Sequence, residues 1–281
     1  MSQPLSDLPT GLFVSPDWLQ QNLDADGLCI VQVGGENFYP RMHIPGAHLV
    51  MYMEIVASVE GVPGMLPSPD MLHPTLSRLG ITPETLVVAY DATGGLDAAR
   101  FLWTLACMGH EKFVTLDGGL GAWYQEQRPM DGEAPKEAPG MFSSSPTGRY
   151  YAEMEDVRAI ADGEAEGFLI DTRSDNEYLG QTLGPVRGHV AGAVHMDWIS
   201  NLKGPQNPYI QDDESLKARF AAIGLSDTAT PVTVYCHTAH RAAHTWLLLR
   251  HLGFDNVKLY DGSMAEWGMR RQPTVRGAEP R

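Results

Sequence analysis

The chain contains little cysteine, few positive charges and no long apolar run. Cys29, Cys107 and Cys236 are the only cysteines in 281 residues. Such a sparse and odd set argues against a disulfide framework and fits a reducing compartment. No stretch approaches the roughly 18 uninterrupted apolar residues of a membrane helix, and the first seven residues lack the basic and apolar regions of a secretory signal. We therefore predict a cytoplasmic protein that has no membrane partner.

Acidic residues outnumber basic ones. Lys and Arg total 20 and Asp and Glu total 35, which gives a formal net charge of −15. A surface of this sign repels nucleic-acid phosphate, so we predict no nucleic-acid partner. An anionic substrate would have to be captured by a local positive site, against the field of the whole protein.

The chain repeats itself at an offset of about 145 residues, the length of a domain rather than of a solenoid repeat. In each half an apolar strand leads through a short loop into an apolar helix. A glycine, a second strand, an Asp-Gly pair and a tryptophan follow. The matching segments are 86–90 and 232–235, 98–108 and 242–252, Gly109 and Gly253, 112–116 and 256–260, Asp117-Gly118 and Asp261-Gly262, and Trp123 and Trp267.

Short strands that alternate with helices predict an α/β fold, with a mainly parallel sheet flanked by helices in each half. We place the first domain at residues 1–127 and the second at 151–281. Residues 128–150 between them are rich in Pro, Gly, Ser, Ala and Glu, and are predicted to be a linker. Two halves that could each fold alone are compatible with a monomer. Ligands of such sheets lie beyond the carboxyl ends of the strands.

The loop that follows the strand 232–235 carries the residues most suited to catalysis. It reads Cys236-His237-Thr238-Ala239-His240-Arg241, and we expect a helix from Ala242. Loop amides and the first turn of a helix favour an anion, and they stabilise a cysteine thiolate at the start of the loop. The side chains of His237, His240 and Arg241 add hydrogen-bond donors. This arrangement predicts nucleophilic attack by Cys236 on an anionic substrate.

The other two cysteines and the first half lack this setting. Cys29 lies within an apolar strand and Cys107 within an apolar helix, so both are expected to be buried as small hydrophobic side chains. Asp91 stands in the first half where Cys236 stands in the second. A carboxylate cannot perform thiol chemistry, so the first half is predicted to be a catalytically silent copy.

Two other chemistries remain open for the same loop. Cys236, His237, His240, His244 and His251 lie within sixteen residues and could hold zinc, although their spacing matches no paired Cys or His-Glu signature. Cysteine phosphatases also place a thiolate in such a loop, but with five residues between Cys and Arg. This chain has four, and a tighter ring of amides would crowd a phosphoryl group while admitting a single sulfur atom.

The sequence resembles the tandem-domain rhodaneses, the thiosulfate and 3-mercaptopyruvate sulfurtransferase family. The resemblance extends from about Val14 to about Trp267. In the second half it rests on residues 171–178 (DTRSDNEY), 188–193 (GHVAGA), the Cys236 loop, and Asp261-Gly262 with Trp267. The first half keeps 43–47 (HIPGA), 117–119 (DGG) and Trp123 but lacks the cysteine, as do inactive first domains of the family.

The resemblance implies two rhodanese-like domains, of which the second is catalytic and needs no cofactor or metal. It implies that Cys236 accepts a sulfane sulfur as a persulfide and passes it to cyanide or a thiol. We assign substrate binding to His237, Thr238, Ala239, His240, Arg241 and Arg187. We assign structural support of the site to Asp171, Arg173 and Glu177, with Arg173 and Glu177, four residues apart, expected to form an ion pair.

The composition of the loop bears on the sulfur donor. Thiosulfate-type members carry Cys-Arg-Lys-Gly-Val-Thr and mercaptopyruvate-type members carry Cys-Gly-Ser-Gly-Val-Thr, whereas this loop is closer to a Cys-Gln-Thr-His-His-Arg variant of bacterial tandem members. It lacks the Ser and Gly of the mercaptopyruvate type, and Arg241 with protonated histidines would suit a dianion. We predict thiosulfate as the donor, with 3-mercaptopyruvate, or a role as a persulfide carrier for a protein partner, as alternatives.

Overall fold

The computed structural model describes residues 5, 9–136, 139–143, 145–184, 186–204 and 207–281. Most of the N-terminal stretch on which the predicted localisation rests lies outside them. Among the described residues, no helix combines the length and apolarity needed to span a membrane.

The chain forms two compact units, and neither is continuous in sequence. The first contains residues 1–56, 67–147 and 205–210, and the second contains 57–66, 148–204 and 211–281. The elements of the first unit are β1 (Phe13–Val14), α1 (Pro16–Gln21), β2 (Leu28–Val33), β3 (His48–Val50), the 3-10 helix η1 (Tyr52–Glu54), α2 (Pro69–Arg78), β6 (Leu86–Tyr90), α3 (Leu96–Cys107), β7 (Phe113–Leu116), α4 (Gly119–Gln125) and β12 (Asn207–Ile210).

The second unit contains β4 (Ala57–Val59), β5 (Val62–Met65), β8 (Tyr151–Ala152), α5 (Met154–Asp162), β9 (Phe168–Asp171), α6 (Asp175–Tyr178), β10 (Val194–His195), the 3-10 helix η2 (Trp198–Asn201), β11 (Leu202–Gly204), α7 (Asp213–Ala222), β13 (Val232–Tyr235), α8 (His240–His251), β14 (Val257–Tyr260) and α9 (Ser263–Met269). From β8 onward it follows an order of elements similar to that of the first unit, with α6 and β11 added.

Each unit is built on a five-stranded sheet in which all neighbouring strands are parallel. The order is β1-β7-β6-β2-β3 in the first unit and, read from the opposite edge, β8-β14-β13-β9-β10 in the second. Strand by strand the two orders correspond. The predicted α/β fold with a mainly parallel sheet in each half is therefore confirmed.

The predicted strands 86–90 and 232–235 are β6 and β13, but both following helices begin two residues earlier than expected. Gly95 and Ala239 directly precede α3 and α8 and have left-handed backbone angles, with φ of 90° and 59°. Each of these residues turns the chain straight into the helix. The loop that starts at Cys236 is therefore shorter than the sequence suggested.

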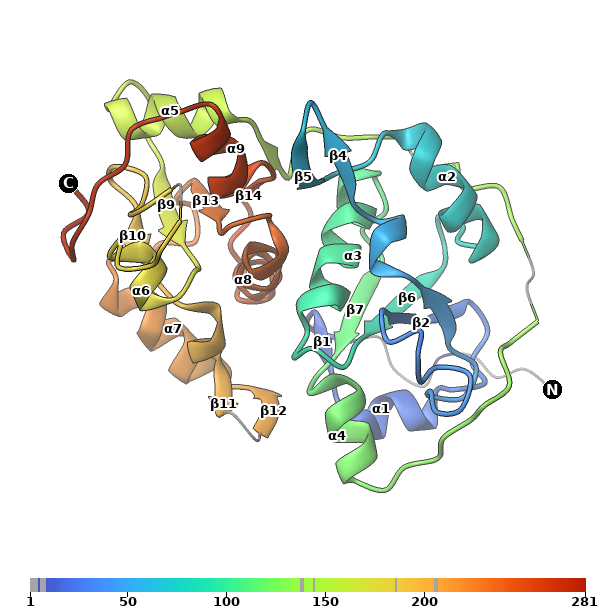
Figure 1. Ribbon diagram of the computed structural model, residues 1–281. Coiled ribbons are helices and arrows are strands. Elements are labelled where there is room, and N and C mark those ends of the chain that lie inside the picture. Colours follow the sequence, from blue (N-terminus) through green and yellow to red (C-terminus); the bar gives the residue numbers. More distant parts are fainter. Residues whose placement is uncertain (1–4, 6–8, 137–138, 144, 185, 205–206) are drawn as a thin grey trace. The chain divides into compact units, whose positions relative to one another are not determined.

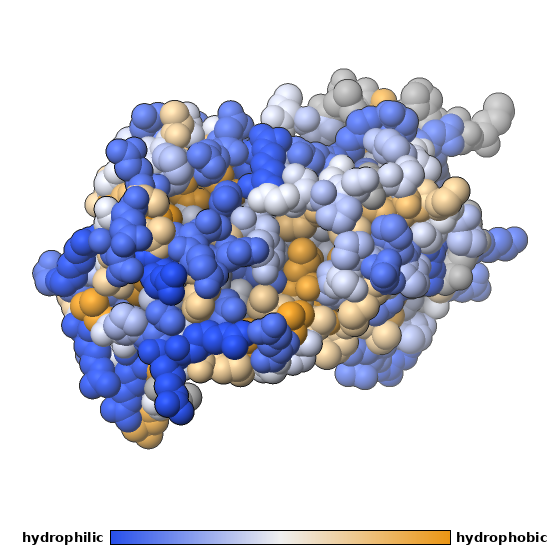
Figure 2. Space-filling view, turned by 90° about the horizontal axis from the view of Figure 1, so that it is seen from above, coloured by the Kyte–Doolittle hydropathy of each residue, from blue (hydrophilic) through white to orange (hydrophobic). Residues whose placement is uncertain are grey.

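Helices cover both faces of the second sheet. Figure 1 shows α5 and α9 on one side of β9, β13 and β14, and α7 and α8 on the other. Val157, Tyr235, Tyr260, Met264 and Trp267 belong to the core cluster of the α5 and α9 side. This packing fixes the carboxyl end of β13, where the Cys236 loop begins. The face drawn in Figure 2 is mostly hydrophilic, with smaller apolar areas, in keeping with the acidic composition.

The duplication gives a matched test of the core. The Tyr235 hydroxyl accepts a hydrogen bond from the Val190 N–H at 3.1 Å, and the Tyr90 hydroxyl accepts one from the Ile44 N–H at 3.0 Å. Tyr235→Phe leaves a buried N–H without an acceptor, so we expect a loss of about 1–3 kcal/mol in the free energy of unfolding. Urea denaturation measures it. Tyr90→Phe should behave alike, whereas Tyr124→Phe, on an exposed side chain, serves as control. An unchanged unfolding midpoint in Tyr235→Phe would contradict the assignment.

Candidate active site

Cys236 lies at the carboxyl end of the central strand of the second sheet. It follows the last residue of β13, and α8 begins at His240. Its side chain is only 1% exposed. The thiol is therefore shielded from bulk solvent at the edge of the sheet where parallel α/β folds bind ligands.

A serine that the sequence analysis did not single out holds the loop. Ser263 Oγ accepts hydrogen bonds from the backbone N–H groups of Cys236 (3.1 Å) and Ala239 (3.2 Å), and donates one to the Tyr260 carbonyl (2.8 Å). Ser263 is fully buried and has φ of 49°, a left-handed conformation that is unfavourable for a residue with a side chain. The sequence signal was available, because Gly119 stands at the matching position of the first half.

The first turn of α9 holds the loop from the same side. The Met264 N–H donates to the Cys236 carbonyl at 3.1 Å, and the Ala265 N–H donates to the His237 carbonyl at 2.9 Å. Both carbonyl groups are thereby turned toward α9. Carbonyl oxygens that would repel an anion are thus kept away from the opposite side of the loop.

Several loop N–H groups remain available to an anion. Within the described residues, the backbone N–H groups of His237, Thr238, Arg241 and Ala242 donate to no protein acceptor. Those of Arg241 and Ala242 belong to the first turn of α8, where the helix dipole adds partial positive charge. The loop therefore offers a ring of unpaired donors beside Cys236.

The first half shows such a ring occupied by an anion. The Asp91 carboxylate accepts hydrogen bonds from the N–H groups of Thr93 (2.9 Å), Gly95 (2.8 Å) and Ala98 (2.9 Å). Burial raises the pKa of Asp91, while these three bonds lower it. A carboxylate oxygen lies one bond beyond the atom that corresponds to cysteine Sγ. The oxygens of Asp91 thus stand where an atom attached to Sγ would stand in the second half.

Arg241 is held by a carboxylate and does not project as a free cation. Its guanidinium donates two hydrogen bonds to Glu177, at 2.6 and 2.9 Å. Burial opposes ionisation of Glu177, but the bonds from Arg241 and Ser174 outweigh it and lower the pKa of Glu177 to about 2. The same pairing outweighs burial at Arg241 and raises the pKa of the guanidinium. The pair fixes the first turn of α8 with no net charge.

The expected ion pair between Arg173 and Glu177 is wrong. Arg173 instead binds Asp171, with Nε at 2.9 and 3.1 Å from the two carboxylate oxygens and Nη2 at 2.5 Å, and it also donates to the Gly188 carbonyl at 2.7 Å. Asp171 is fully buried and lies in register with Tyr235, the residue before Cys236. Arg173 precedes α6, so it and Glu177 do not lie one helical turn apart on the same helix. Asp171, two residues away at the end of β9, is therefore the carboxylate that Arg173 binds.

The loop side chains contribute less positive charge than expected. Partial desolvation, with the cations Arg241 and Arg173 nearby, lowers the pKa of His237, so its ring is neutral at pH 7. Thr238 and His240 are half-buried, and Ala239 is buried at the left-handed turn. Anion capture at this loop therefore depends on backbone N–H groups more than on a charged His237 ring.

Arg187 is not brought to the loop by any contact among the described residues. Its carbonyl accepts a hydrogen bond from the Thr274 hydroxyl at 2.7 Å, which ties it to the C-terminal segment. The five residues considered for zinc are also dispersed. His244 is buried against Trp198 (ring centroids 5.5 Å apart), and His251 contacts Asp213 at 3.1 Å. No cluster suited to a metal ion occurs in the part of the chain that the structure describes.

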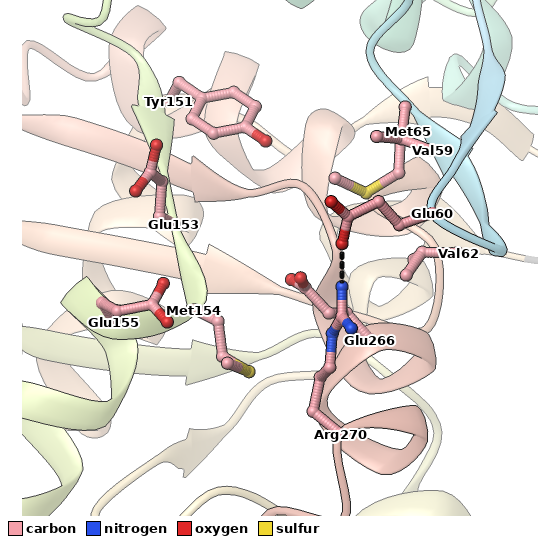
Figure 3. A pocket seen from close by; sticks show the side chains of 10 residues that line it. All are labelled: Val59, Glu60, Val62, Met65, Tyr151, Glu153, Met154, Glu155, Glu266 and Arg270. Carbon is pink, nitrogen blue, oxygen red and sulfur yellow. Dashed lines mark hydrogen bonds and ion pairs between the residues drawn. The ribbon is translucent and has the colours of Figure 1, made fainter.

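Cys29 and Cys107 are buried, as predicted. Burial raises the pKa of the Cys29 thiol to about 12, which keeps it protonated. A cavity of about 480 Å³ in the second unit has no lining residue from the Cys236 loop. Figure 3 shows it between β4–β5, the start of α5 and α9, with Arg270 paired to Glu60. Glu153, Glu155 and Glu266 add carboxylates to its wall, which would repel an anionic substrate.

The pair of Glu177 and Arg241 predicts a pH-dependent stability. The pKa of Glu177 falls from its ordinary 4.5 to about 2 on folding, so the pair stabilises the fold above pH 4.5 and this contribution is lost as the pH falls toward 2. We expect Glu177→Gln to lower the free energy of unfolding by about 2–3 kcal/mol at pH 7. The deficit should shrink below pH 4.5. Denaturant unfolding from pH 7 to pH 3 measures it, with Glu164→Gln, on an exposed side chain, as control. A deficit independent of pH would contradict the pairing.

Comparisons with known proteins agree with this fold. The profile of the rhodanese-like domain matches residues 15–126 and 153–270. A thiosulfate sulfurtransferase of Azotobacter vinelandii is 33% identical over 258 residues, which cover 92% of this chain and 94% of that protein. A sulfur carrier protein of Thermus thermophilus, TtuD, is 30% identical over 279 residues, with coverage of 92% and 93%.

A solved structure supports the same relationship. The crystal structure of SseA from Escherichia coli, described as a 3-mercaptopyruvate sulfotransferase, superimposes with a TM-score of 0.80 at 26% identity, covering 90% of this chain and 99% of that one. Two profile matches and two matching parallel sheets lead to one conclusion. The chain belongs to the rhodanese-like family and carries two copies of its domain.

Proposed function

We propose that this protein is a sulfurtransferase that moves sulfane sulfur from a small anionic donor to a thiol or cyanide through a persulfide on Cys236. The first half serves as a silent copy, because Asp91 occupies the position of the nucleophile. The reaction needs no cofactor.

One observation carries the proposal. In the first half, loop N–H groups bind the carboxylate oxygens of Asp91, one bond beyond the position of Sγ. The loop of the second half is one residue shorter, since Ala239 comes three positions after Cys236 and Gly95 comes four positions after Asp91. Counted from the strand, Thr238 matches Thr93, and counted from the helix, Ala242 matches Ala98. Within the described residues, the N–H groups of Thr238 and Ala242 have no protein acceptor. A sulfur atom attached to Cys236 Sγ would reach the same place. The ring of donors is thus suited to the outer sulfur of a persulfide.

The chemistry follows from this placement. With thiosulfate, the Cys236 thiolate attacks the sulfane sulfur, a new S–S bond forms, and the old S–S bond breaks so that sulfite leaves with its electron pair. The acceptor then attacks the outer sulfur, and the electron pair of the Cys236 S–S bond returns to Sγ as a thiolate. The loop N–H groups stabilise negative charge in both steps, as an oxyanion hole does.

The side chains around the loop act mainly by positioning. Glu177 orients Arg241, Asp171 and Arg173 brace the strand end, and Ser263 holds the loop backbone. Because Arg241 and Glu177 neutralise each other, capture of the donor against the −15 net charge depends on the backbone donors and the dipole of α8. Among the described residues, no hydrogen bond or ion pair joins Arg187 to the loop, so its proposed part in donor binding would require its side chain to move.

Thiosulfate is the donor we favour. The loop lacks the Ser and Gly of the mercaptopyruvate type, and the relative from Azotobacter vinelandii is named a thiosulfate sulfurtransferase. The structural relative from Escherichia coli is described as acting on 3-mercaptopyruvate, which makes that compound the alternative donor. A comparison of kcat/KM for the two donors decides between them. A higher value for 3-mercaptopyruvate would overturn the choice.

A second role is favoured by the relative from Thermus thermophilus, which is named a sulfur carrier protein. In that role the Cys236 persulfide would be delivered to a protein partner. Persulfide formation without turnover of small acceptors would support the carrier role over the enzyme.

The proposal predicts that turnover depends on the sulfur atom of the Cys236 side chain. Purified protein should form thiocyanate from thiosulfate and cyanide. The rate of Cys236→Ser should fall to background, because a serine hydroxyl cannot accept the sulfane sulfur in place of a thiolate. Cys107→Ser, on a buried cysteine in α3 of the first unit, is the matched control and should retain turnover. Hydrolysis of an aryl phosphate that depends on Cys236 would instead support a phosphatase.

Ser263 should affect catalysis more than stability. Ser263→Ala removes the hydrogen bonds to two loop N–H groups. Ser263→Gly removes them too, but glycine adopts the left-handed conformation at this position without its steric cost. We expect both to lower kcat about 30-fold, since the two neutral hydrogen bonds contribute about 1 kcal/mol each, with the glycine variant the more stable of the two. Steady-state kinetics and thermal unfolding measure this. If the loss of kcat followed the loss of stability, or if the control Ser215→Ala lost as much, the positioning role would be wrong.

A further inference from the structure

A second described cavity of the second unit, of about 430 Å³, is lined by charged side chains of both signs. It is formed by the end of β10, η2 and α7, and its size lies within the range of small-molecule sites, about 300–1,000 Å³. Asp175, Asp197 and Arg219 supply the charges, and Met196 and Ile223 supply apolar wall. A pocket with this mixture favours neither a simple anion nor a simple cation.

Arg219 lacks a partner within the described residues. Its Nε is buried and forms no hydrogen bond, and no ion pair joins its guanidinium to a carboxylate. The side chain as a whole is half-buried, so its guanidinium is open to an acceptor from outside the chain. A ligand carboxylate could supply that acceptor.

Asp197 offers the complementary charge. It caps η2 by accepting the Ile199 N–H through Oδ1 at 3.2 Å, and no ion pair joins it to Arg219 although both line the same cavity. Asp175, by contrast, already contacts His195 Nδ1 at 3.2 Å. A ligand that brings an ammonium group to Asp197 and a carboxylate to Arg219 would satisfy both.

The pocket lies on the same edge of the sheet as Cys236. His195, Asp171 and Tyr235 are in register across β10, β9 and β13, and Cys236 follows Tyr235. Two strand spacings of about 4.8 Å place the end of β10 roughly 10 Å from the end of β13. Arg241 interacts electrostatically with both Cys236 and Asp197.

We propose that this pocket, between Asp197 and Arg219, binds the amino-acid head group of a zwitterionic thiol that accepts sulfur from Cys236. The proposal rests on the proposed function, because it assigns the acceptor of the same reaction. The acceptor thiolate attacks the outer sulfur of the persulfide and forms a new S–S bond. The bond to Sγ breaks, and its electron pair restores the Cys236 thiolate, with no external oxidant or reductant.

The test compares acceptors that carry one, both or neither of the two charges. Protein loaded with thiosulfate and freed of excess donor is discharged by L-cysteine, cysteamine, 3-mercaptopropionate or cyanide, and mass spectrometry follows the loss of the added sulfur. Each variant is compared with wild type for each acceptor separately, so differences in thiol reactivity cancel. Cyanide has no head group and reports on the Cys236 loop alone.

We expect the two variants to slow different pairs of acceptors, with L-cysteine common to both pairs. Relative to cyanide, Arg219→Gln should slow discharge by L-cysteine and 3-mercaptopropionate about tenfold, the effect of one charge-assisted hydrogen bond, and should spare cysteamine. Asp197→Asn keeps a good helix cap and should slow L-cysteine and cysteamine but spare 3-mercaptopropionate. Lys217→Gln removes a charge from the exposed face of the same helix and should change nothing. Equal effects on all acceptors, or none on L-cysteine, would overturn the proposal.

A binding measurement separates this proposal from the proposed function. If wild-type protein takes up no sulfur, the sulfurtransferase assignment fails and the pocket is tested alone, by calorimetry with the unreactive S-methyl-L-cysteine. Binding to wild type that is lost in Arg219→Gln supports the pocket. Absence of binding to wild type refutes it.

Discussion

The structure depends on a loop that is held firmly while several of its N–H groups stay unpaired. Buried donors without acceptors are costly, so the surrounding fold has to compensate for them. Ser263 and the first turn of α9 do so by fixing the Cys236 and Ala239 N–H groups and two loop carbonyls. Among the described residues, the N–H groups of His237, Thr238, Arg241 and Ala242 then remain for the anion that the proposed persulfide would supply.

The two halves solve the same problem in different ways. The first supplies its own anion, Asp91, and needs no side chain at Gly119, where a Cβ would lie 2.6 Å from the Asp91 carbonyl oxygen. The second replaces the carboxylate with a shorter thiol and gains the Ser263 hydroxyl beneath the loop. The same strand-loop-helix unit therefore binds its own carboxylate in the first half and leaves loop N–H groups without a protein acceptor among the described residues of the second.

Much of this could be predicted from the sequence, and the failures share a physical cause. Strand 232–235, the position of Cys236 beyond it and the matching position of Asp91 follow from apolar runs and an internal repeat, which are local signals. The partners of Arg173 and Glu177 were not predictable from spacing, because Asp171 and Arg241 reach them through the tertiary fold. The role of Ser263 required knowing that residues 27 positions apart are in contact.

The central claim is that Cys236 carries a sulfur atom within this ring of donors, and the mass of the intact protein tests it most directly. After incubation with thiosulfate and removal of excess donor, the protein should gain the mass of one sulfur atom, which peptide mapping should place on Cys236 and which Cys236→Ser should lack. A wild-type mass that stays unchanged, or a gain that persists in Cys236→Ser, would contradict the account.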